Sequence, residues 1–287
     1  MDRRLTLTGQ PSSFTIPMKN SKLYLLLACV VLLGGCGKDD PKEDDTPDIM
    51  KSSAKVYKDR SIYSDAMNMS ISYSIWLPPS YDENKTYPVL YLLHGYEFFE
   101  TQIANAHNGW FTQASLNSNA TKYVWGGGEL FIIVTPNGQN SFYMDDYDDR
   151  HLKYGTFFED EFIPFIEKEY HGNGKRAIAG LSMGGFGTLY HCLTHPEKFT
   201  YAYACSPAAW GLEGVVKSCD KSKVPGITLE TGTEDMTVSL STVTSFSDIL
   251  KENGIDHELI TRSGGHTWQF WEACLPKILK KVGESFK

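Results

Sequence analysis

From residue 87 onward, hydrophobic residues gather into continuous runs that end at glycine, proline or a polar turn. These runs occupy residues 87–95, 129–138, 176–182, 199–207 and 224–235. Continuous apolar runs are typical of parallel strands that are buried on both faces of a sheet. An earlier segment, residues 71–79, alternates apolar and polar positions and ends in prolines, which predicts an outer strand.

Helical patterns lie between these runs. In residues 156–170 the side chains of Phe158, Phe162, Phe165 and Ile166 share one side of a helix. Strands that alternate with helices predict an α/β fold with a doubly wound, mostly parallel sheet. We expect one catalytic domain over residues 55–287.

The beginning of the chain has a different pattern. Residues 18–36 start with a methionine and nearby lysines, continue with an apolar run over 23–33, and end in Leu-Gly-Gly-Cys. This order is typical of a secretory signal, and the run is short for a membrane span. The ending resembles a bacterial lipobox, so residues 1–36 are interpreted as a lipoprotein signal segment with Cys36 as the lipidated residue. The alternative is an ordinary signal peptide with an incidental cysteine.

Under the lipoprotein interpretation Met18 is the natural start, and residues 1–17 are an upstream extension. Residues 37–54 follow with an acidic, proline-containing sequence that lacks apolar periodicity, which predicts a disordered tether. Acidic residues directly behind a lipidated cysteine resemble the export signal of surface lipoproteins. We therefore expect an exported protein attached to the outer membrane or cell surface; a merely solvated linker is the alternative.

Composition and charge limit the classes of molecule that the protein is expected to bind. The chain has 287 residues, of which 41% are hydrophobic, and this suits one large globular domain. Its formal net charge of -8 argues against a nucleic-acid partner, because phosphate binding needs a basic face. The cysteines beyond Cys36 match no metal motif. A bridge between Cys205 and Cys219 and free buried thiols both remain open; the cysteines concerned are Cys192, Cys205, Cys219 and Cys274.

Ser182 is the candidate nucleophile. It lies in Gly-Leu-Ser-Met-Gly, residues 180–184, between a predicted buried strand and a predicted helix. This context is that of a nucleophile elbow, in which residues without a Cβ relieve crowding at a strained turn. A phosphate-binding loop is the rival interpretation, but the segment lacks the G-x-G-x-x-G order and a Walker lysine. An α/β-hydrolase fold is therefore predicted.

A serine nucleophile requires a base, and in α/β-hydrolases the base follows the acid along the chain. His266 lies in a glycine-rich segment before a C-terminal helical pattern, and it is the predicted base. His191 and His195 fall in the helix after the nucleophile, where they are expected to face away or cap the helix. His257 is expected on a strand.

The acid should follow the strand predicted over 224–235. Glu234 and Asp235 both occur there, and Asp235 is preferred as the residue that orients the base. Three other aspartates are weaker candidates because the sequence around them predicts a linker or a helix: Asp220, Asp248 and Asp256.

Backbone N–H groups should stabilise the oxyanion, one from the residue after the nucleophile and one from an early strand–helix loop. The first is Met183. The second is assigned to Tyr96, which follows the strand predicted over 87–95. His94 precedes Gly95 at the end of that strand, and a structural role is expected for it.

Together these segments resemble a known family. "YPVLYLLHG", "RAIAGLSMGGFGTL", "GTED" and "GGHTWQFW" resemble the esterase D superfamily, with the nearest likeness to the first family of carbohydrate esterases. "NAHNGW" and "NGQNSFYMDD" are similar to segments of the related mycolyltransferases. The resemblance implies an α/β-hydrolase with Ser182, Asp235 and His266 as catalytic triad and Tyr96 and Met183 at the oxyanion hole. The loop "YEFFE" departs from the feruloyl esterase pattern, because it lacks further glycines.

The resulting hypothesis is an exported, lipid-anchored serine carboxylesterase that removes feruloyl or acetyl groups from plant cell-wall polysaccharide such as xylan. No metal or organic cofactor is implied. Three aromatic residues are candidates for stacking on the substrate: Tyr143, Trp210 and Trp268.

Three alternatives to this hypothesis stay open. The first is an acyltransferase of mycolyltransferase type. The second is another small-ester or thioester hydrolase, such as an S-formylglutathione hydrolase. The third is a catalytically inert glycan-binding lipoprotein.

Overall fold

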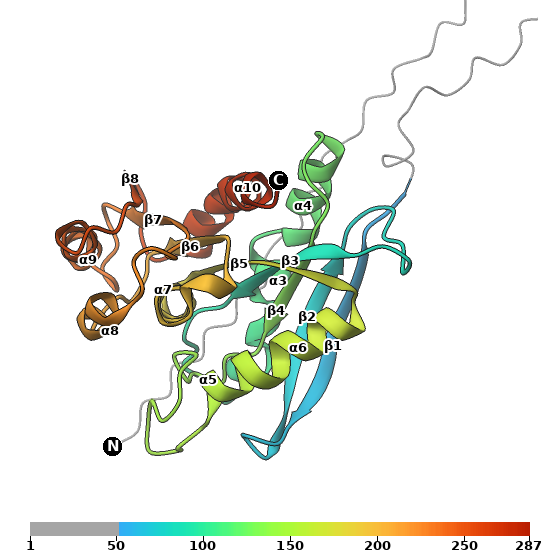
Figure 1. The fold of residues 1–287 in the computed structure, drawn as a ribbon, viewed down its shortest axis with the longest axis horizontal. Helices are drawn as coiled ribbons and strands as arrows, with labels where there is room; N and C mark the ends of the chain where they lie inside the picture. The colour runs from blue at the N-terminus through green and yellow to red at the C-terminus, as the bar shows by residue number, and fades with distance from the viewer. Residues whose placement is uncertain (1–51) are drawn as a thin grey trace, which may run out of the picture. The chain divides into compact units, whose positions relative to one another are not determined.

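The computed structural model of the protein describes residues 52–287, whose strands form one eight-stranded sheet (Figure 1). The strand order is β1-β2-β4-β3-β5-β6-β7-β8. β1 pairs antiparallel with β2, as β2 does with β4, and all other neighbouring strands are parallel. The predicted α/β fold with a mostly parallel sheet is confirmed. The predicted signal segment, Cys36 and most of the predicted tether lie outside the described residues.

The predicted apolar runs form the centre of this sheet. All residues of β3 are buried, as are those of β4, because helices cover both faces of the sheet at these positions. The strands are β1 (Lys55–Ser64), β2 (Met69–Leu77), β3 (Tyr87–Leu93), β4 (Ile132–Pro136), β5 (Gly172–Leu181), β6 (Tyr201–Cys205), β7 (Gly226–Gly232) and β8 (Glu258–Arg262).

The helices lie mainly between the strands along the chain. The predicted helix over 156–170 is observed as α5, a π-helical turn over Phe157–Phe162, and α6. The α-helices are α2 (Glu100–Asn105), α3 (Gly109–Gln113), α4 (Leu116–Trp125), α5 (Tyr154–Thr156), α6 (Ile163–Glu169), α7 (Met183–Thr194), α8 (Glu213–Ser218), α9 (Leu240–Glu252) and α10 (Trp268–Ser285). None of these described helices is both long and apolar enough to cross a membrane.

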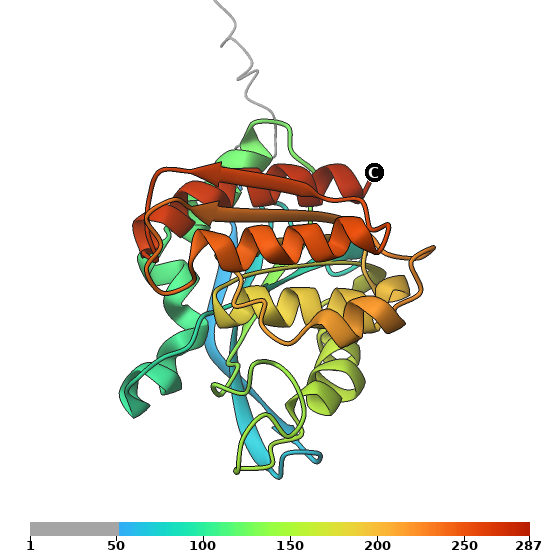
Figure 2. The same ribbon diagram turned by 90° about the vertical axis from the view of Figure 1, so that its left-hand side faces the viewer.

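The two faces of the sheet are covered by different helices. α3, α4 and α10 pack on one face, where Trp76, Trp110 and Leu275 are part of a buried cluster (Figure 1). On the other face, α6, α7 and α9 are seen together in Figure 2, and Phe162, Leu189 and other apolar residues are buried beneath them. The central strands therefore have an apolar layer on each side.

The parallel strand order brings separate loops to one edge of the sheet. β3, β5, β6 and β7 are successive neighbours, so their carboxyl ends lie along the same edge. Ligand sites in open α/β sheets occur at this edge. The segments that begin at His94, Ser182 and Thr233 leave the sheet there.

Sequence patterns did not indicate β1. Its burial pattern is mostly exposed or half-buried, so it carries no continuous apolar run. Because β1 pairs with β2 at the edge of the sheet, the strand predicted over 71–79 is second from that edge and ends at Leu77, before the prolines.

One further expectation needs correction, and one open alternative is decided. His257 does not lie on a strand: it precedes β8 by one residue, and its Nε2 lies 2.6 Å from Ser247 Oγ of α9. Cys205 and Cys219 do not form a bridge. The thiols of the described cysteines are all free, and burial raises the pKa of the Cys192 thiol.

Candidate active site

Ser182 occupies the turn between β5 and α7 with a left-handed backbone. Its φ is +54° and its ψ is -116°, a conformation that costs free energy for a residue with a Cβ. Hydrogen bonds hold the turn from both directions. The Ser182 N–H donates to the Cys205 carbonyl (2.9 Å), and the Ser182 carbonyl accepts from the N–H groups of Phe186 (3.0 Å) and Ala208 (3.1 Å). The strained conformation presents the hydroxyl at the sheet edge.

Glycines allow neighbouring segments to approach this turn. A Cβ added at Gly95 would lie 2.7 Å from Leu181 Cδ1 and 3.4 Å from Ser182 Cβ. A Cβ at Gly184 would lie 2.6 Å from the carbonyl oxygens of Leu93 and His94. The loop after β3 therefore packs directly against the serine turn, at a distance that larger residues would not permit.

The structure brings Ser182, His266 and Asp235 into one hydrogen-bonded chain. His266 Nε2 lies 2.9 Å from Ser182 Oγ, and His266 Nδ1 lies 2.8 Å from Asp235 Oδ2. Because the carboxylate can only accept, Nδ1 carries the proton and Nε2 is free to accept from the serine hydroxyl. This arrangement can activate a serine oxygen as a nucleophile.

Asp235, and not Glu234, is the carboxylate that contacts His266. Asp235 is buried, and its other oxygen accepts from the N–H groups of Thr237 (3.0 Å) and Val238 (2.8 Å). The exposed Glu234 points elsewhere and accepts from the Thr233 and Ser263 hydroxyls and the Gly264 N–H. Those hydrogen bonds hold the pKa of the Glu234 carboxyl below its usual value.

In the described part of the chain, the other candidate acids and bases do not contact Ser182. His191 of α7 is buried away from Ser182, with Nδ1 2.6 Å from Glu159 Oε1 and Nε2 2.8 Å from the Tyr143 carbonyl. His195 ends α7 as its C-cap. The weaker acid candidates Asp220 and Asp248 are exposed and pair with nearby lysines of their own segments.

A buried charge cluster supports the loop that carries His266. Glu230 of β7 is fully buried and binds Arg262 of β8, Lys277 of α10 and the Tyr203 hydroxyl. Burial opposes ionisation of Glu230, but these hydrogen bonds outweigh it and lower the pKa of the carboxyl. Arg262 also donates to the Phe270 carbonyl (2.6 Å). The cluster thus ties β7, β8 and α10 together on both sides of residues 263–267.

Two backbone donors are placed to receive a negative oxygen. Met183 is the first residue of α7, so its N–H has no partner within the helix. Within residues 52–287 the Tyr96 N–H has no hydrogen-bond acceptor, and it follows Gly95, which packs against the serine turn. Both N–H groups are therefore free for a ligand, as an oxyanion hole requires.

His94 fixes the peptide unit that carries the Tyr96 N–H. The buried ring donates from Nδ1 to the Gly95 carbonyl (2.6 Å) and accepts at Nε2 from the Gly138 N–H (2.7 Å). Burial lowers the pKa of His94 to about 4, so the ring is neutral at physiological pH and has one donor and one acceptor nitrogen. In a trans peptide the C=O and N–H point in opposite directions, so a fixed Gly95 carbonyl also fixes the Tyr96 N–H.

Residues 137–143 brace the same loop, a role that the sequence patterns did not reveal. The Asn140 side chain accepts from the Glu97 N–H (3.0 Å) and donates to the Glu97 carbonyl (2.6 Å). Tyr143 was a candidate for substrate stacking, but its ring is fully buried and its hydroxyl bonds the backbone N–H (2.9 Å) and carbonyl (3.1 Å) of His94. That prediction is wrong, because a buried ring has no face to offer a ligand. The run of asparagine and glycine in "NGQN" is the only sequence signal for this brace.

A pocket of about 410 Å³ opens over Ser182. Its volume lies within the range of small-molecule sites. Trp268 lines it, and that ring is held by edge-to-face contacts with Trp110 and Trp271. Trp210 is 53% exposed but is not among the lining residues. Besides Ser182, His266 and Trp268, the lining consists of Gly95, Tyr96, Glu97, Phe98, Phe99, Gln102, Leu181, Thr237, Thr267 and Trp271.

The loop that departs from the feruloyl esterase pattern forms the aromatic wall of this pocket. Tyr96 is 45%, Phe98 83% and Phe99 67% exposed, which is high for aromatic side chains. Burial raises the pKa of Glu97, which shares the same wall. Over residues 52–287, no three histidine, cysteine or acidic side chains gather as metal ligands would.

Comparisons with known proteins match most of the described chain. A family model named Esterase, described as "Putative esterase", matches residues 64–282. An acetyl esterase of Caldicellulosiruptor saccharolyticus is 26% identical over 230 residues, which are 66% of this chain and 80% of that protein. A solved structure of a ferulic acid esterase has a TM-score of 0.72 at 28% identity and covers 82% of this chain and 100% of its own.

A longer relative matches over one part of its length. It is an endo-1,4-beta-xylanase/feruloyl esterase of Xylanibacter ruminicola, 27% identical over 227 residues. The match covers 73% of this chain and 29% of the relative.

The contact between Asp235 and His266 predicts unequal effects of two substitutions. Asp235→Ala should lower kcat/KM for 4-nitrophenyl acetate by about 10³–10⁴, because His266 loses its orienting acceptor. Glu234→Ala is the matched control, and its loss should stay within about tenfold, since Glu234 reaches only the loop beside His266. A larger loss for Glu234→Ala would contradict the assignment.

The two hydrogen bonds of His94 can be separated by amide substitutions. Asn places a donor near Nδ1 and can still bond the Gly95 carbonyl, whereas Gln places its amide near Nε2 and the Gly138 N–H. We expect His94→Gln to lower kcat by about 10² with little change in KM, and His94→Asn to stay closer to the wild-type protein. Steady-state kinetics and melting temperatures of both variants test this. Equal losses in two folded variants would contradict a positioning role.

Proposed function

The chain belongs to the Esterase family, and we propose that it is a serine carboxylesterase that removes feruloyl or acetyl groups from plant cell-wall polysaccharide such as xylan. The hydrogen-bonded chain from Ser182 through His266 to Asp235, with free backbone donors beside it, carries this proposal. The acetyl esterase and ferulic acid esterase relatives are those expected from the resemblance to the first carbohydrate esterase family.

In the proposed mechanism Ser182 Oγ attacks the ester carbonyl while His266 Nε2 takes the hydroxyl proton. Asp235 remains ionised and stabilises the imidazolium that forms. The N–H groups of Tyr96 and Met183 bind the negative oxygen of the tetrahedral intermediate. His266 then protonates the leaving alcohol, and water hydrolyses the acyl-enzyme through the same base.

The pocket favours an aromatic acyl group over acetyl as the preferred substrate. Its 410 Å³ far exceeds what an acetyl group fills, and aromatic rings line much of it, among them Tyr96, Phe99 and Trp268. An aryl acid can bury its ring against such a wall and gain stacking contacts that an acetyl group cannot make. The name of the xylanase/feruloyl esterase relative supports xylan as the polymer.

We also propose that the protein is exported and anchored through a lipid on Cys36, with the esterase domain over 55–287 joined by the acidic tether. The order of the signal-like segment supports this. The proposed substrate, an insoluble extracellular polymer, supports it too. A lipid anchor would keep the enzyme at the cell while the tether lets it reach the polymer.

Release of acids from defined esters tests the activity. The wild-type protein should release ferulate from methyl ferulate and from feruloylated xylan, and Ser182→Ala should lower this by about 10⁴ or more. 4-Nitrophenyl acetate and acetylated xylan, assayed in parallel, separate a feruloyl esterase from a deacetylase. No serine-dependent release from any of these esters would contradict the proposal. A new ester formed with an added sugar alcohol would instead indicate an acyltransferase.

Fractionation of expressing bacteria tests the anchor. The wild-type protein should sediment with membranes, whereas Cys36→Ala should lose the lipid and leave the membrane fraction, with unchanged kcat/KM on methyl ferulate. Equal membrane association of both proteins would contradict lipidation at Cys36.

A further inference from the structure

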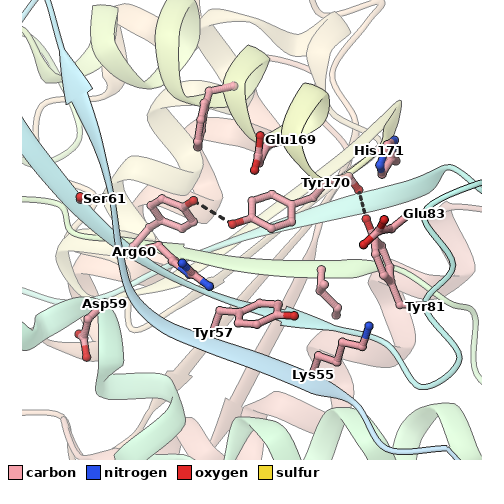
Figure 3. A pocket seen from close by; sticks show the side chains of 13 residues that line it. Lys55, Tyr57, Asp59, Arg60, Ser61, Tyr81, Glu83, Glu169, Tyr170 and His171 are labelled. Carbon is pink, nitrogen blue, oxygen red and sulfur yellow. Dashed lines mark hydrogen bonds between the residues drawn. The ribbon is translucent and has the colours of Figure 1, made fainter.

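A second cleft is separate from the pocket over Ser182. Its volume is about 680 Å³, and it lies between β1 and β2 on one side and the end of α6 on the other (Figure 3). No residue of this cleft lines the pocket over Ser182. Glu169, Tyr170 and His171 stand before the amino end of β5, whereas Ser182 follows its carboxyl end. These three residues lie about the length of a ten-residue strand, about 30 Å, from Ser182.

A β-bulge arranges the strand side of the cleft. In β1, Lys55, Tyr57 and Arg60 pair with residues 77, 75 and 73 of β2, which share one face of the sheet. Residues three apart in a regular strand point to opposite faces, so Tyr57 and Arg60 share a face only because the bulge inserts one residue between them. The Arg60 guanidinium consequently lies 4.9 Å from the centre of the Tyr57 ring.

The backbone of the bulge is strained, and hydrogen bonds to neighbouring segments hold it. Asp59 has a φ of +55°, which is uncommon for a residue other than glycine. Its carboxylate accepts from Asn108 Nδ2 (2.7 Å) and bonds His107 Nε2 (2.9 Å), and its N–H donates to Ser74 Oγ (3.3 Å). Strained positions that several contacts maintain are concentrated at functional sites. The result of this strained bulge is that one face of β1 carries Lys55, Tyr57 and Arg60.

Tyrosines line much of the rest of the cleft. The Tyr73 and Tyr170 hydroxyls bond each other (2.9 Å), and the Tyr81 hydroxyl donates to the Tyr170 carbonyl (3.1 Å). Tyr81 also stacks on Tyr87, with ring centres 5.0 Å apart. Tyr57 and Tyr170 are only half-buried, so part of each ring faces the cleft (Figure 3).

Charged groups of both signs surround these rings. Lys55 and Arg60 are exposed on the strand side, and Glu83 and Glu169 are exposed across the cleft. The balance of charge does not suit a polyanion, and the polar rim does not suit an apolar ligand. Aromatic faces combined with hydrogen-bond donors and acceptors suit a neutral, polyhydroxylated ligand. A pyranose ring has this character, since its C–H face packs on aromatic rings and its hydroxyls bond charged side chains.

We propose that this cleft is a second, non-catalytic carbohydrate site that holds a neutral stretch of a β-linked pentose polymer such as the xylan main chain. Arg60 lies over one face of the Tyr57 ring, so the sugar packs on the part of this half-buried ring that stays open to the cleft. Lys55, Arg60, Glu83 and Glu169 bond the sugar hydroxyls. The choice of xylan rests on the proposed function, whereas the choice of a sugar rests on the cleft itself. A polymer bound here stays near the active site, which raises the effective concentration of its ester groups.

Calorimetric titration of the full chain with xylohexaose tests this site. Tyr57→Ala should weaken binding by about tenfold through loss of the stacking face. Arg60→Ala should also weaken it, while kcat/KM for methyl ferulate should be unchanged in both variants. Tyr63→Ala is the matched control, because Tyr63 is a 57% exposed tyrosine of the same strand that does not line the cleft. It should bind like the wild-type protein.

Several outcomes would overturn the proposal. One is the absence of xylohexaose binding to the wild-type protein. Another is binding that Tyr57→Ala leaves intact and Trp268→Ala removes, which would place the sugar in the pocket over Ser182. Binding that depends on Tyr57 in a protein without esterase activity would support the cleft while the proposed function failed.

Discussion

A serine with a left-handed backbone lies between β5 and α7, and the surrounding segments are arranged to hold it there. The Cys205 carbonyl at the end of β6 and the Ala208 N–H of the segment after it fix its peptide groups. On the other side, the loop after β3 comes so close that a Cβ at Gly184 would lie 2.6 Å from the carbonyl oxygens of Leu93 and His94. The same close approach brings the Tyr96 N–H beside the serine. The strained backbone of Ser182, the packing of the loop after β3 and the free backbone N–H groups therefore depend on one another.

Two buried polar side chains connect the segments around Ser182 and His266 to the rest of the domain by hydrogen bonds. His94 joins the loop after β3 to Gly138, and so to the braced segment after β4. Glu230 joins β7, β8 and α10 around the loop that carries His266. Each is fully satisfied by hydrogen bonds, which is the condition under which a buried polar network is rigid rather than costly. The site thus depends on residues that no substrate would touch.

The two ends of β5 have different chemistry. At the carboxyl end the segments that follow the parallel strands meet at Ser182 and a pocket lined by aromatic side chains. Before the amino end, Tyr170 and His171 border a larger polar cleft, which the antiparallel strands β1 and β2 also line. A polymer long enough to span the domain could occupy both. Under the two proposals the outer strands hold the polysaccharide while its esters react at Ser182.

The amino-acid sequence by itself determined the parallel core, because its strands are continuous apolar runs, and it determined the turn at Ser182, because glycines at fixed offsets mark it. It also indicated His266 and left Glu234 and Asp235 as neighbours on one turn. Only the tertiary structure decided which carboxylate reaches His266, that Tyr143 is buried, and that a bulge in β1 turns Arg60 toward Tyr57. The reason is physical: periodicity reports local burial, whereas side-chain direction at a turn or bulge depends on contacts between segments distant in the chain.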